Sequence, residues 1–285
     1  MIKKIVIYSI FIILFIVIVA LYGILISVFP RRHVTAIKPS DIGLKYENVT
    51  LKTSDNINLK AWFIPNNRTK NAIIVCHGYP FDKGNILSYT SFLHKEYNLL
   101  FFDFRAMGES LGKHTTIGYK EVEDVKAAIS YLKKREIKRI GAIGFSLGAA
   151  TILMTKSKDI KAIVADSSYA SLDLMINALY KQFFFLKYPF VAATKIFTKL
   201  ILKIDTAELS PEGAIKEIKT PVLLIHGERD NQISVENSYL LHKANPKTEL
   251  WIVEGANHGE AYYLKGEEYE KRVLEFFSHH LRLNQ

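Results

Sequence analysis

The sequence predicts an α/β protein with a mostly parallel sheet, helices on both of its faces and a transmembrane helix at the N-terminus. Three observations lead to this prediction. The chain opens with a long uncharged apolar run, two alternating segments follow, and short apolar runs then alternate with helical stretches to the C-terminus. Such alternation indicates a parallel sheet, because parallel strands need crossover connections, which are usually helices.

The N-terminal run, residues 5–29, carries no charged side chain. About 20 apolar residues span the hydrocarbon core of a bilayer, so this run is long enough to cross one. A cleaved signal peptide would have a shorter apolar stretch and a small-residue cleavage site, whereas this run ends in Val28-Phe29-Pro30. We therefore expect a single-pass cell-membrane anchor with a basic flank and short linker over residues 1–33, and one domain over residues 34–285. Basic residues flank both ends of the run, so the positive-inside rule does not choose the side of the membrane.

Charge and cysteine content exclude several classes of protein. The formal net charge is +10, but the lysines are scattered and no basic helix is interleaved with aromatic residues. This pattern does not indicate nucleic-acid binding; we interpret it as a lysine-rich solvated surface, with some attraction to anionic lipid as the alternative. The single cysteine, Cys76, permits neither an intrachain disulfide nor a cysteine-based zinc site. It lies in an apolar run and is predicted to be buried.

The first strands are predicted from alternation. Residues 49–53 and 57–64 alternate around a Ser54-Asp55-Asn56 turn, which is typical of an antiparallel hairpin. Short, continuously apolar runs follow, and such runs suit strands buried on both faces of a parallel sheet. These runs are residues 72–76, 99–102, 140–145, 162–165, 222–225 and 250–253.

Helical periodicity fills the stretches between these runs. Residues 121–135 place Val125, Ile129 and Leu132 on one face, and residues 267–279 show the same spacing. Ligands in sheets of this kind bind at the carboxyl ends of the strands.

Residues 171–203 interrupt the alternation of strand and helix. The segment is rich in aromatic and aliphatic residues and lies between two predicted strands. We expect a helical cap insertion here that lines an apolar pocket over the strand ends. Ordinary helices packed on the sheet are the alternative. Lys181, Lys187 and Lys195 argue against a second membrane helix.

The candidate nucleophile is Ser146, in Gly144-Phe145-Ser146-Leu147-Gly148. The motif follows a predicted strand and precedes a predicted helix, which is the setting of a nucleophile elbow. A sharp turn at this point holds the serine in a strained backbone conformation, so the flanking positions must be small. The hydroxyl then projects over the strand ends.

A serine hydroxyl needs a base, and the base needs an orienting acid. Of the nine histidines, His258 follows the last predicted strand in a loop before the last helix, and we predict it to be the base. Asp230 follows the penultimate strand and is predicted to be the acid, since this fold orders its triad Ser, Asp, His. Glu228 and Asp166 are the alternatives. His77 and His226, each before a glycine at a strand end, are interpreted as structural.

Two backbone N–H groups are predicted to form an oxyanion hole. One belongs to Leu147, directly after the nucleophile, and the other to Tyr79, in the loop after the strand at residues 72–76. The Tyr79 side chain is a candidate for the pocket wall. Asp103 and Arg105 are expected to brace the loop beside the elbow, with substrate contact as the alternative.

Taken together, these motifs resemble the α/β-hydrolase superfamily from about residue 46 to the C-terminus. Within it, the chain looks like bacterial membrane-anchored hydrolases of the Bem46-like and serine-aminopeptidase-like groups. Ala106 stands where many members have glycine. The motifs, which occur in the family's order, are His77-Gly78, Asp103-x-Arg105-x-x-Gly108-x-Ser110, the elbow, His226-Gly227-x-x-Asp230 and His258.

The resemblance implies hydrolysis of an ester, thioester or amide through a covalent acyl-enzyme, with no metal or organic cofactor. An apolar cap favours a small-molecule acyl ester as the substrate. A serine peptidase is the alternative within hydrolases, and a non-catalytic membrane-tethered binding module is the alternative outside them. Dehalogenase chemistry is disfavoured, because the elbow carries serine rather than aspartate.

Overall fold

The computed structural model describes residues 2–282, which contain one eight-stranded sheet in the order β1-β2-β4-β3-β5-β6-β7-β8. The strand β2 runs antiparallel to both β1 and β4, and the remaining neighbours are parallel. The strands are β1 (Glu47–Lys52), β2 (Asn58–Ile64), β3 (Asn71–Cys76), β4 (Asn98–Phe102), β5 (Arg139–Phe145), β6 (Ile160–Asp166), β7 (Val222–Gly227) and β8 (Glu249–Val253). The predicted hairpin and each predicted apolar run coincide with a strand, so the predicted fold class is confirmed.

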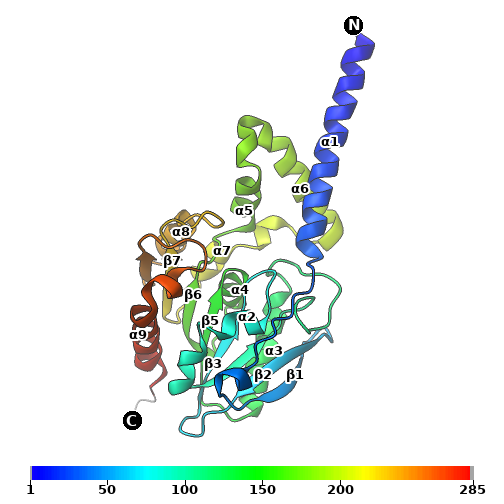
Figure 1. Ribbon diagram of the computed structural model, residues 1–285. Coiled ribbons are helices and arrows are strands. Elements are labelled where there is room, and N and C mark those ends of the chain that lie inside the picture. The colour runs from blue at the N-terminus through cyan, green and yellow to red at the C-terminus, as the bar shows by residue number, and fades with distance from the viewer. Residues whose placement is uncertain (1, 283–285) are drawn as a thin grey trace.

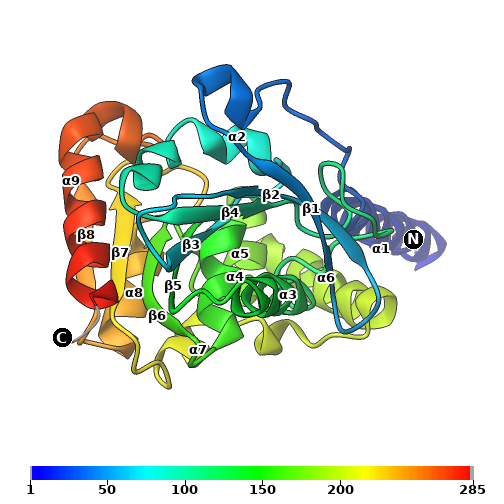
Figure 2. The same ribbon diagram turned by 90° about the horizontal axis from the view of Figure 1, so that it is seen from below.

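Helices cover both faces of the sheet, as Figure 2 shows. One apolar cluster joins the sheet to α3 (Glu121–Lys134), α4 (Leu147–Thr155), α7 (Pro211–Ile215) and α8 (Glu236–Ala244). The other joins the opposite face to α2 (Lys83–Leu87), η2 (Ser91–Lys95) and α9 (Ala261–Leu281). Alternate residues of a strand point to opposite faces, so Ile73 belongs to one cluster and Ile74 to the other. The short 3-10 helices η1 (Pro39–Ile42) and η4 (Thr206–Glu208) lie in connections.

The last helix begins earlier than the periodicity predicts. It starts at Ala261, and its helical geometry is interrupted at Gly266, with φ of 8° and ψ of −89°. The periodic pattern could be read only from residue 267, after this interruption.

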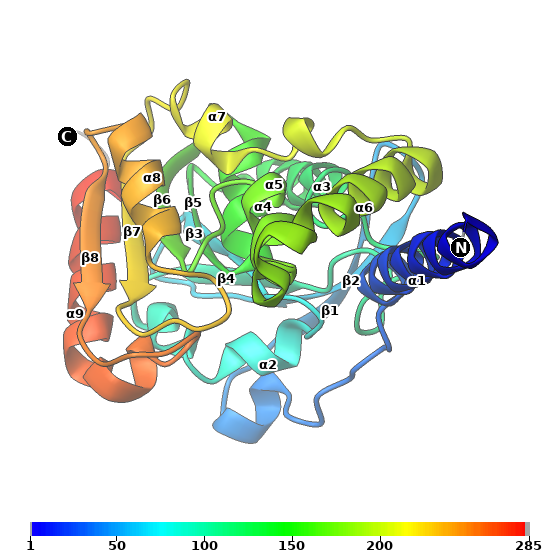
Figure 3. The ribbon, with the colours of Figure 1, turned by 90° about the horizontal axis from the view of Figure 1, so that it is seen from above.

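The insertion at residues 171–203 lies between β6 and β7. It forms α5 (Leu172–Leu179), η3 (Lys181–Leu186) and α6 (Lys187–Leu202), which together we call the cap. The cap rises from the end of the sheet where the parallel strands finish and runs beside the long helix α1 (Ile2–Val28), as Figures 1 and 3 show. The rings of Phe15 and Phe190 meet edge to face with centroids 6.1 Å apart.

The segment that follows α1 is docked on the domain rather than loose. The Arg32 guanidinium donates to the backbone carbonyls of Gly108, Ser110 and Gly112. The Thr35 backbone N–H and hydroxyl both donate to the Asp82 carboxylate, at 2.6 Å each. Part of the basic flank therefore fixes α1 to the domain, a role that charge alone did not predict.

Candidate active site

Ser146 lies in the sharp turn between β5 and α4. Its backbone has φ of 53° and ψ of −114°, a conformation that a residue with a side chain adopts only under strain. The Ser146 N–H donates to the Asp166 carbonyl at 2.8 Å, which ties the turn to the neighbouring strand. These are the features of a nucleophile elbow.

The two glycines of the motif allow close backbone approach. A Cβ on Gly144 would lie 2.6 Å from the backbone nitrogen of Ala149, and a Cβ on Gly148 would lie 2.7 Å from the His77 carbonyl oxygen. Both distances are below contact distance for carbon, so any larger residue must displace backbone. The spacing of the motif therefore follows from packing of the elbow between β5, α4 and the end of β3.

We expect Gly148→Ala to lower both stability and hydrolytic activity, because the new methyl group pushes the end of β3 and the Tyr79 loop away from Ser146. Overpacking of this kind costs about 1–3 kcal/mol. Denaturant unfolding and ester turnover measure the two effects. Gly213→Ala is the control, since its methyl group would meet only the Ser210 side chain, at 3.2 Å and 3.5 Å; equal stability of the two variants would contradict the prediction.

The structure brings Asp230 and His258 together. The loop after β7 carries Asp230 and the loop after β8 carries His258, and the His258 Nδ1 lies 2.7 Å from the Asp230 Oδ2. The Asp230 side chain is fully buried and the His258 side chain is 10% exposed. An Nδ1–H donated to this carboxylate leaves Nε2 as the free ring nitrogen, which is the tautomer a general base requires.

Further donors converge on Asp230. Its Oδ1 accepts from the backbone N–H groups of Gln232 and Ile233, at 2.9 and 2.8 Å. Its Oδ2 also lies 3.2 Å from the Nε2 of His226. Burial raises the pKa of Asp230, but the hydrogen bonds from His226, His258 and Ile233 outweigh burial and hold that pKa well below its ordinary value. The carboxyl group is therefore ionised.

This lowered pKa predicts a pH dependence of stability. An acid whose pKa is depressed by folding contributes stability above its unfolded pKa, about 3.9 for Asp, and the contribution is lost as the pH falls through the folded pKa. The difference in unfolding free energy between wild type and Asp230→Asn should therefore shrink as the pH is lowered below about 4. Denaturant titrations of both proteins between neutral and acidic pH measure it; a difference that widens in acid would contradict the assignment.

Neither alternative acid contacts His258 in this way. The Asp166 carboxylate accepts from the hydroxyls of Ser167 and Tyr269, each at 2.9 Å. The Glu228 carboxylate accepts from the Gly255 N–H at 3.0 Å. Both therefore serve as local hydrogen-bond acceptors.

Ser146 and His258 line the same pocket, and no hydrogen bond joins their side chains within residues 2–282. Without substrate, such catalytic hydrogen bonds are often long or poorly aligned. The His258 ring packs on Phe145, the residue before the nucleophile, with centroids 4.8 Å apart. His258 is thus held at the elbow by packing as well as by Asp230.

The predicted oxyanion donors lie beside Ser146. Leu147 opens α4, and Tyr79 follows β3; both residues line the pocket with Ser146. Within residues 2–282, neither backbone N–H donates a hydrogen bond to another part of the protein. Both donors are therefore available to a ligand.

The histidines interpreted as structural are buried and hydrogen-bonded. His77 accepts from the Phe104 N–H at 3.0 Å, and its Nδ1 lies 2.7 Å from the Gly78 carbonyl. Burial lowers the pKa of His77, which keeps this bridge neutral. The Nδ1 of His226 lies 2.6 Å from the hydroxyl oxygen of Ser238. It also contacts Asp230, a link that sequence spacing did not reveal.

Asp103 and Arg105 brace the loop at residues 103–110 through ion pairs. Asp103 accepts from the Lys83 ammonium at 2.7 Å, and Arg105 pairs with both Asp55 and Asp124. None of these side chains lines the pocket. Ala106, where glycine is usual, has φ of 61°, so the departure carries some backbone strain and lies outside the pocket.

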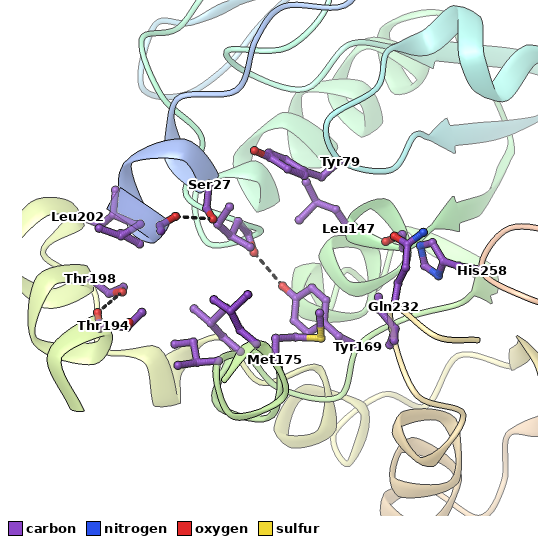
Figure 4. A pocket seen from close by; sticks show the side chains of 18 residues that line it. Ser27, Tyr79, Leu147, Tyr169, Met175, Thr194, Thr198, Leu202, Gln232 and His258 are labelled. Atoms are coloured by element: carbon purple, nitrogen blue, oxygen red, sulfur yellow. Dashed lines mark hydrogen bonds between the residues drawn. The ribbon is translucent and has the colours of Figure 1, made fainter. Parts of the chain in front are cut away.

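A cavity of about 290 Å³ extends from Ser146 and His258 to the cap. Figure 4 shows His258 on one side of this pocket and Ser27 and Leu202 on the other. Its walls are mostly apolar, with Met175 and Leu179 contributed by the cap. The structure adds a wall that we did not predict: Gly23, Ile24 and Ser27 of α1 also line it. The small residues at positions 23 and 27 form a small-x-x-x-small pattern, which is the signal of a packing face on a membrane helix.

Metal ligation has no obvious site in this region. Within residues 2–282, no group of three or more His, Cys, Asp or Glu side chains is arranged to hold a metal ion.

The chain is similar in sequence and in structure to several known proteins. The sequence profile of the prolyl oligopeptidase family matches residues 105–284. The Bacillus subtilis protein YqkD is 32% identical over 228 residues, which cover 76% of this chain and 74% of the relative. The Pyrococcus furiosus esterase Pf2001 is 34% identical, with a TM-score of 0.76 over 90% of this chain and 99% of the esterase. A Saccharomyces cerevisiae membrane protein is 27% identical over 236 residues, covering 79% of this chain and 76% of that protein.

Proposed function

Since the chain belongs to the prolyl oligopeptidase family and is a hydrolase of the α/β-hydrolase fold, we propose that it is a membrane-anchored serine esterase that uses Ser146, His258 and Asp230. The observation that carries the proposal is the apolar cavity that ends at Ser146 and His258, with Asp230 2.7 Å behind the histidine. The apolar walls suit an acyl chain. No nucleic acid enters the proposal; its partners are a small-molecule acyl substrate and the bilayer.

The chemistry follows from the positions of these groups. His258 takes the hydroxyl proton of Ser146 as Oγ bonds to the ester carbonyl carbon. The N–H groups of Leu147 and Tyr79 hold the resulting oxyanion. The bond to the alkoxy group breaks as His258 returns the proton, releasing an alcohol. Water then repeats the sequence, bonding to the acyl carbon while its proton passes through His258 to the departing Ser146 oxygen, which releases a carboxylic acid.

Asp230 supports both steps without taking a proton. Its ionised carboxylate holds the tautomer of His258 and stabilises the imidazolium formed in each step. No metal or organic cofactor is required.

The helix α1 supports the membrane part of the proposal. Residues 2–28 form a helix that is long and apolar enough to cross a bilayer. One relative is itself described as a membrane protein. We propose a single-pass anchor.

A serine peptidase is the second candidate, because the matched family is named for oligopeptidases. A peptidase that holds the amino terminus of its substrate needs an acidic group near the nucleophile. Among the described residues that line the cavity, none carries a carboxylate. This composition favours an ester over a peptide.

The experiment is turnover of p-nitrophenyl esters from acetate to palmitate, beside aminoacyl anilides, by the full-length protein in detergent. Ester turnover without anilide turnover supports the proposal, and anilide turnover alone would assign a peptidase. Fluorophosphonate labelling separates an enzyme from a non-catalytic binding module. An absence of both labelling and turnover would overturn the proposal.

A further inference from the structure

The cap has an end that points away from the sheet (Figure 1), and large apolar side chains are exposed in η3 and at the start of α6. Phe184 and Phe185 are 78% and 76% exposed, and Leu186 and Tyr188 are 58% and 64% exposed. We call these four residues the cap tip. A contiguous exposed apolar group of this kind marks an interaction surface, and aromatic residues flanked by lysine are typical of segments that lie in a membrane interface.

The helix α1 sets the depth of the cap in a bilayer. Lys3 and Lys4 must stay at the far interface, so the roughly 20 residues that span the hydrocarbon core run from residue 5 to about Ile24. The cap contacts α1 inside this span, through Phe15 against Phe190 and through Ile16 and Val19. Phe15 lies nine residues before Ile24, which is about 14 Å along a helix. An upright α1 therefore carries the cap below the near boundary of the hydrocarbon, and a tilted one carries it less deeply.

The position of the cap relative to a bilayer follows that of α1, because α1 is fixed to the domain. The Val28 carbonyl accepts from the Thr115 N–H at 2.9 Å, and the Ile26 carbonyl accepts from the Tyr79 hydroxyl at 3.0 Å. Arg32 adds its hydrogen bonds to the carbonyls of the loop at residues 108–112. Withdrawing the cap into water would draw Lys3 and Lys4 into the hydrocarbon, which is unfavourable.

The cavity meets α1 at the level of this boundary. Gly23, Ile24 and Ser27 line it from α1 and the cap lines it as well, together with Ser146. Apolar walls contributed by α1 and by the cap thus line the cavity from the level of this boundary to Ser146.

We propose that the cap tip is inserted into the near leaflet beside α1, and that the substrate is a long-chain acyl ester taken from the bilayer. The proposed long-chain substrate specifies the proposed esterase function further and rests on it. The proposed insertion of the cap tip is independent of that function.

The depth is tested with a cysteine probe in proteoliposomes of phosphatidylcholine and phosphatidylglycerol. Phe185→Cys is labelled with a nitrobenzoxadiazole dye, and Cys76, which is fully buried, stays unlabelled. The control is Lys133→Cys, at the C-terminal end of α3, whose side chain is 57% exposed. We expect brominated lipid chains to quench the dye at position 185 and not at position 133. If the dye at position 185 is as little quenched by brominated lipid as the dye at position 133, the proposed insertion of the cap tip is wrong.

The substrate is tested with a variant that carries Phe184→Ser, Phe185→Ser and Leu186→Ser, none of which lines the cavity. Hydrolysis of 4-methylumbelliferyl palmitate embedded in the same vesicles should fall by about tenfold, because membrane insertion scales with apolar area. Hydrolysis of soluble p-nitrophenyl acetate should stay unchanged. The matched control is Tyr263→Ser with Leu264→Ser, which removes exposed apolar side chains from α9 (68% and 54% exposed).

Equal loss on both esters, or loss in the α9 control, would overturn the bilayer substrate. A wild type that hydrolyses neither ester would overturn the proposed esterase function and the lipid substrate with it. The quenching result would still decide the position of the cap tip, so the two failures are distinguishable.

Discussion

Ser146→Ala is expected to lower ester turnover by about 10⁵- to 10⁶-fold, the scale on which removal of a triad serine acts. The physical reason is that no other hydroxyl is held at the elbow, so the acyl-enzyme cannot form. Fluorophosphonate labelling should disappear with turnover. Burst and steady-state kinetics on the best p-nitrophenyl ester measure the loss.

The same substitution should leave stability near that of the wild type. Within residues 2–282, the Ser146 hydroxyl makes no hydrogen bond to another side chain or to the backbone, and alanine keeps the Cβ that strains the turn. Ser146→Gly is the informative companion: it should be equally inactive but more stable, since glycine accepts a φ of 53° at little cost. Activity that survives in Ser146→Ala would remove the serine from the mechanism.

Asp230→Asn should lower kcat by about 10⁴-fold while the fold persists, since an asparagine in this position favours the wrong histidine tautomer. The Asp230 Oδ2 is the acceptor that fixes His258 Nδ1–H, at 2.7 Å. An amide nitrogen placed there would donate to Nδ1 and move the ring proton to Nε2, where a base must be free. The pH–rate profile and kcat on the ester panel measure this effect.

Glu228→Gln is the matched control, because Glu228 lies in the same loop and its carboxylate accepts only from the Gly255 N–H among its described contacts. Its rate should remain close to that of the wild type. A large loss in Glu228→Gln with little loss in Asp230→Asn would reverse the assignment of the acid.

Sequence spacing predicted those parts of the site that lie in a local motif or directly after a parallel strand. The elbow is local, so Gly144, Ser146 and Gly148 could be recognised from five residues and the strand before them. Asp230 and His258 could be chosen because parallel strands end at one edge of the sheet, which gathers the loops that follow them. Their pairing was predicted in this way, and the structure brings the two side chains together; the catalytic roles remain a prediction.

Other parts of the site depended on contacts between distant segments. The His226–Asp230 contact forms because the loop after β7 folds back on its own strand. No motif or spacing in the sequence predicts this contact. The Arg32 hydrogen bonds to the loop at residues 108–112 join segments far apart in the chain. From the sequence, Arg32 could be interpreted only as one of several basic residues that flank the apolar run. Its charge can be read from the sequence, but the backbone carbonyls that accept its hydrogen bonds cannot.

The sequence by itself determined the fold class, the long apolar N-terminal helix and the elbow, because each depends on a local period, length or motif. Only the tertiary structure decided that α1 lies against the cap and forms a wall of the cavity. That contact depends on how two apolar helices pack side by side. An apolar helix suits a lipid or a protein neighbour equally well, so hydrophobicity predicts only that α1 avoids water. The packing shows that Gly23 and Ser27 of this helix line the cavity.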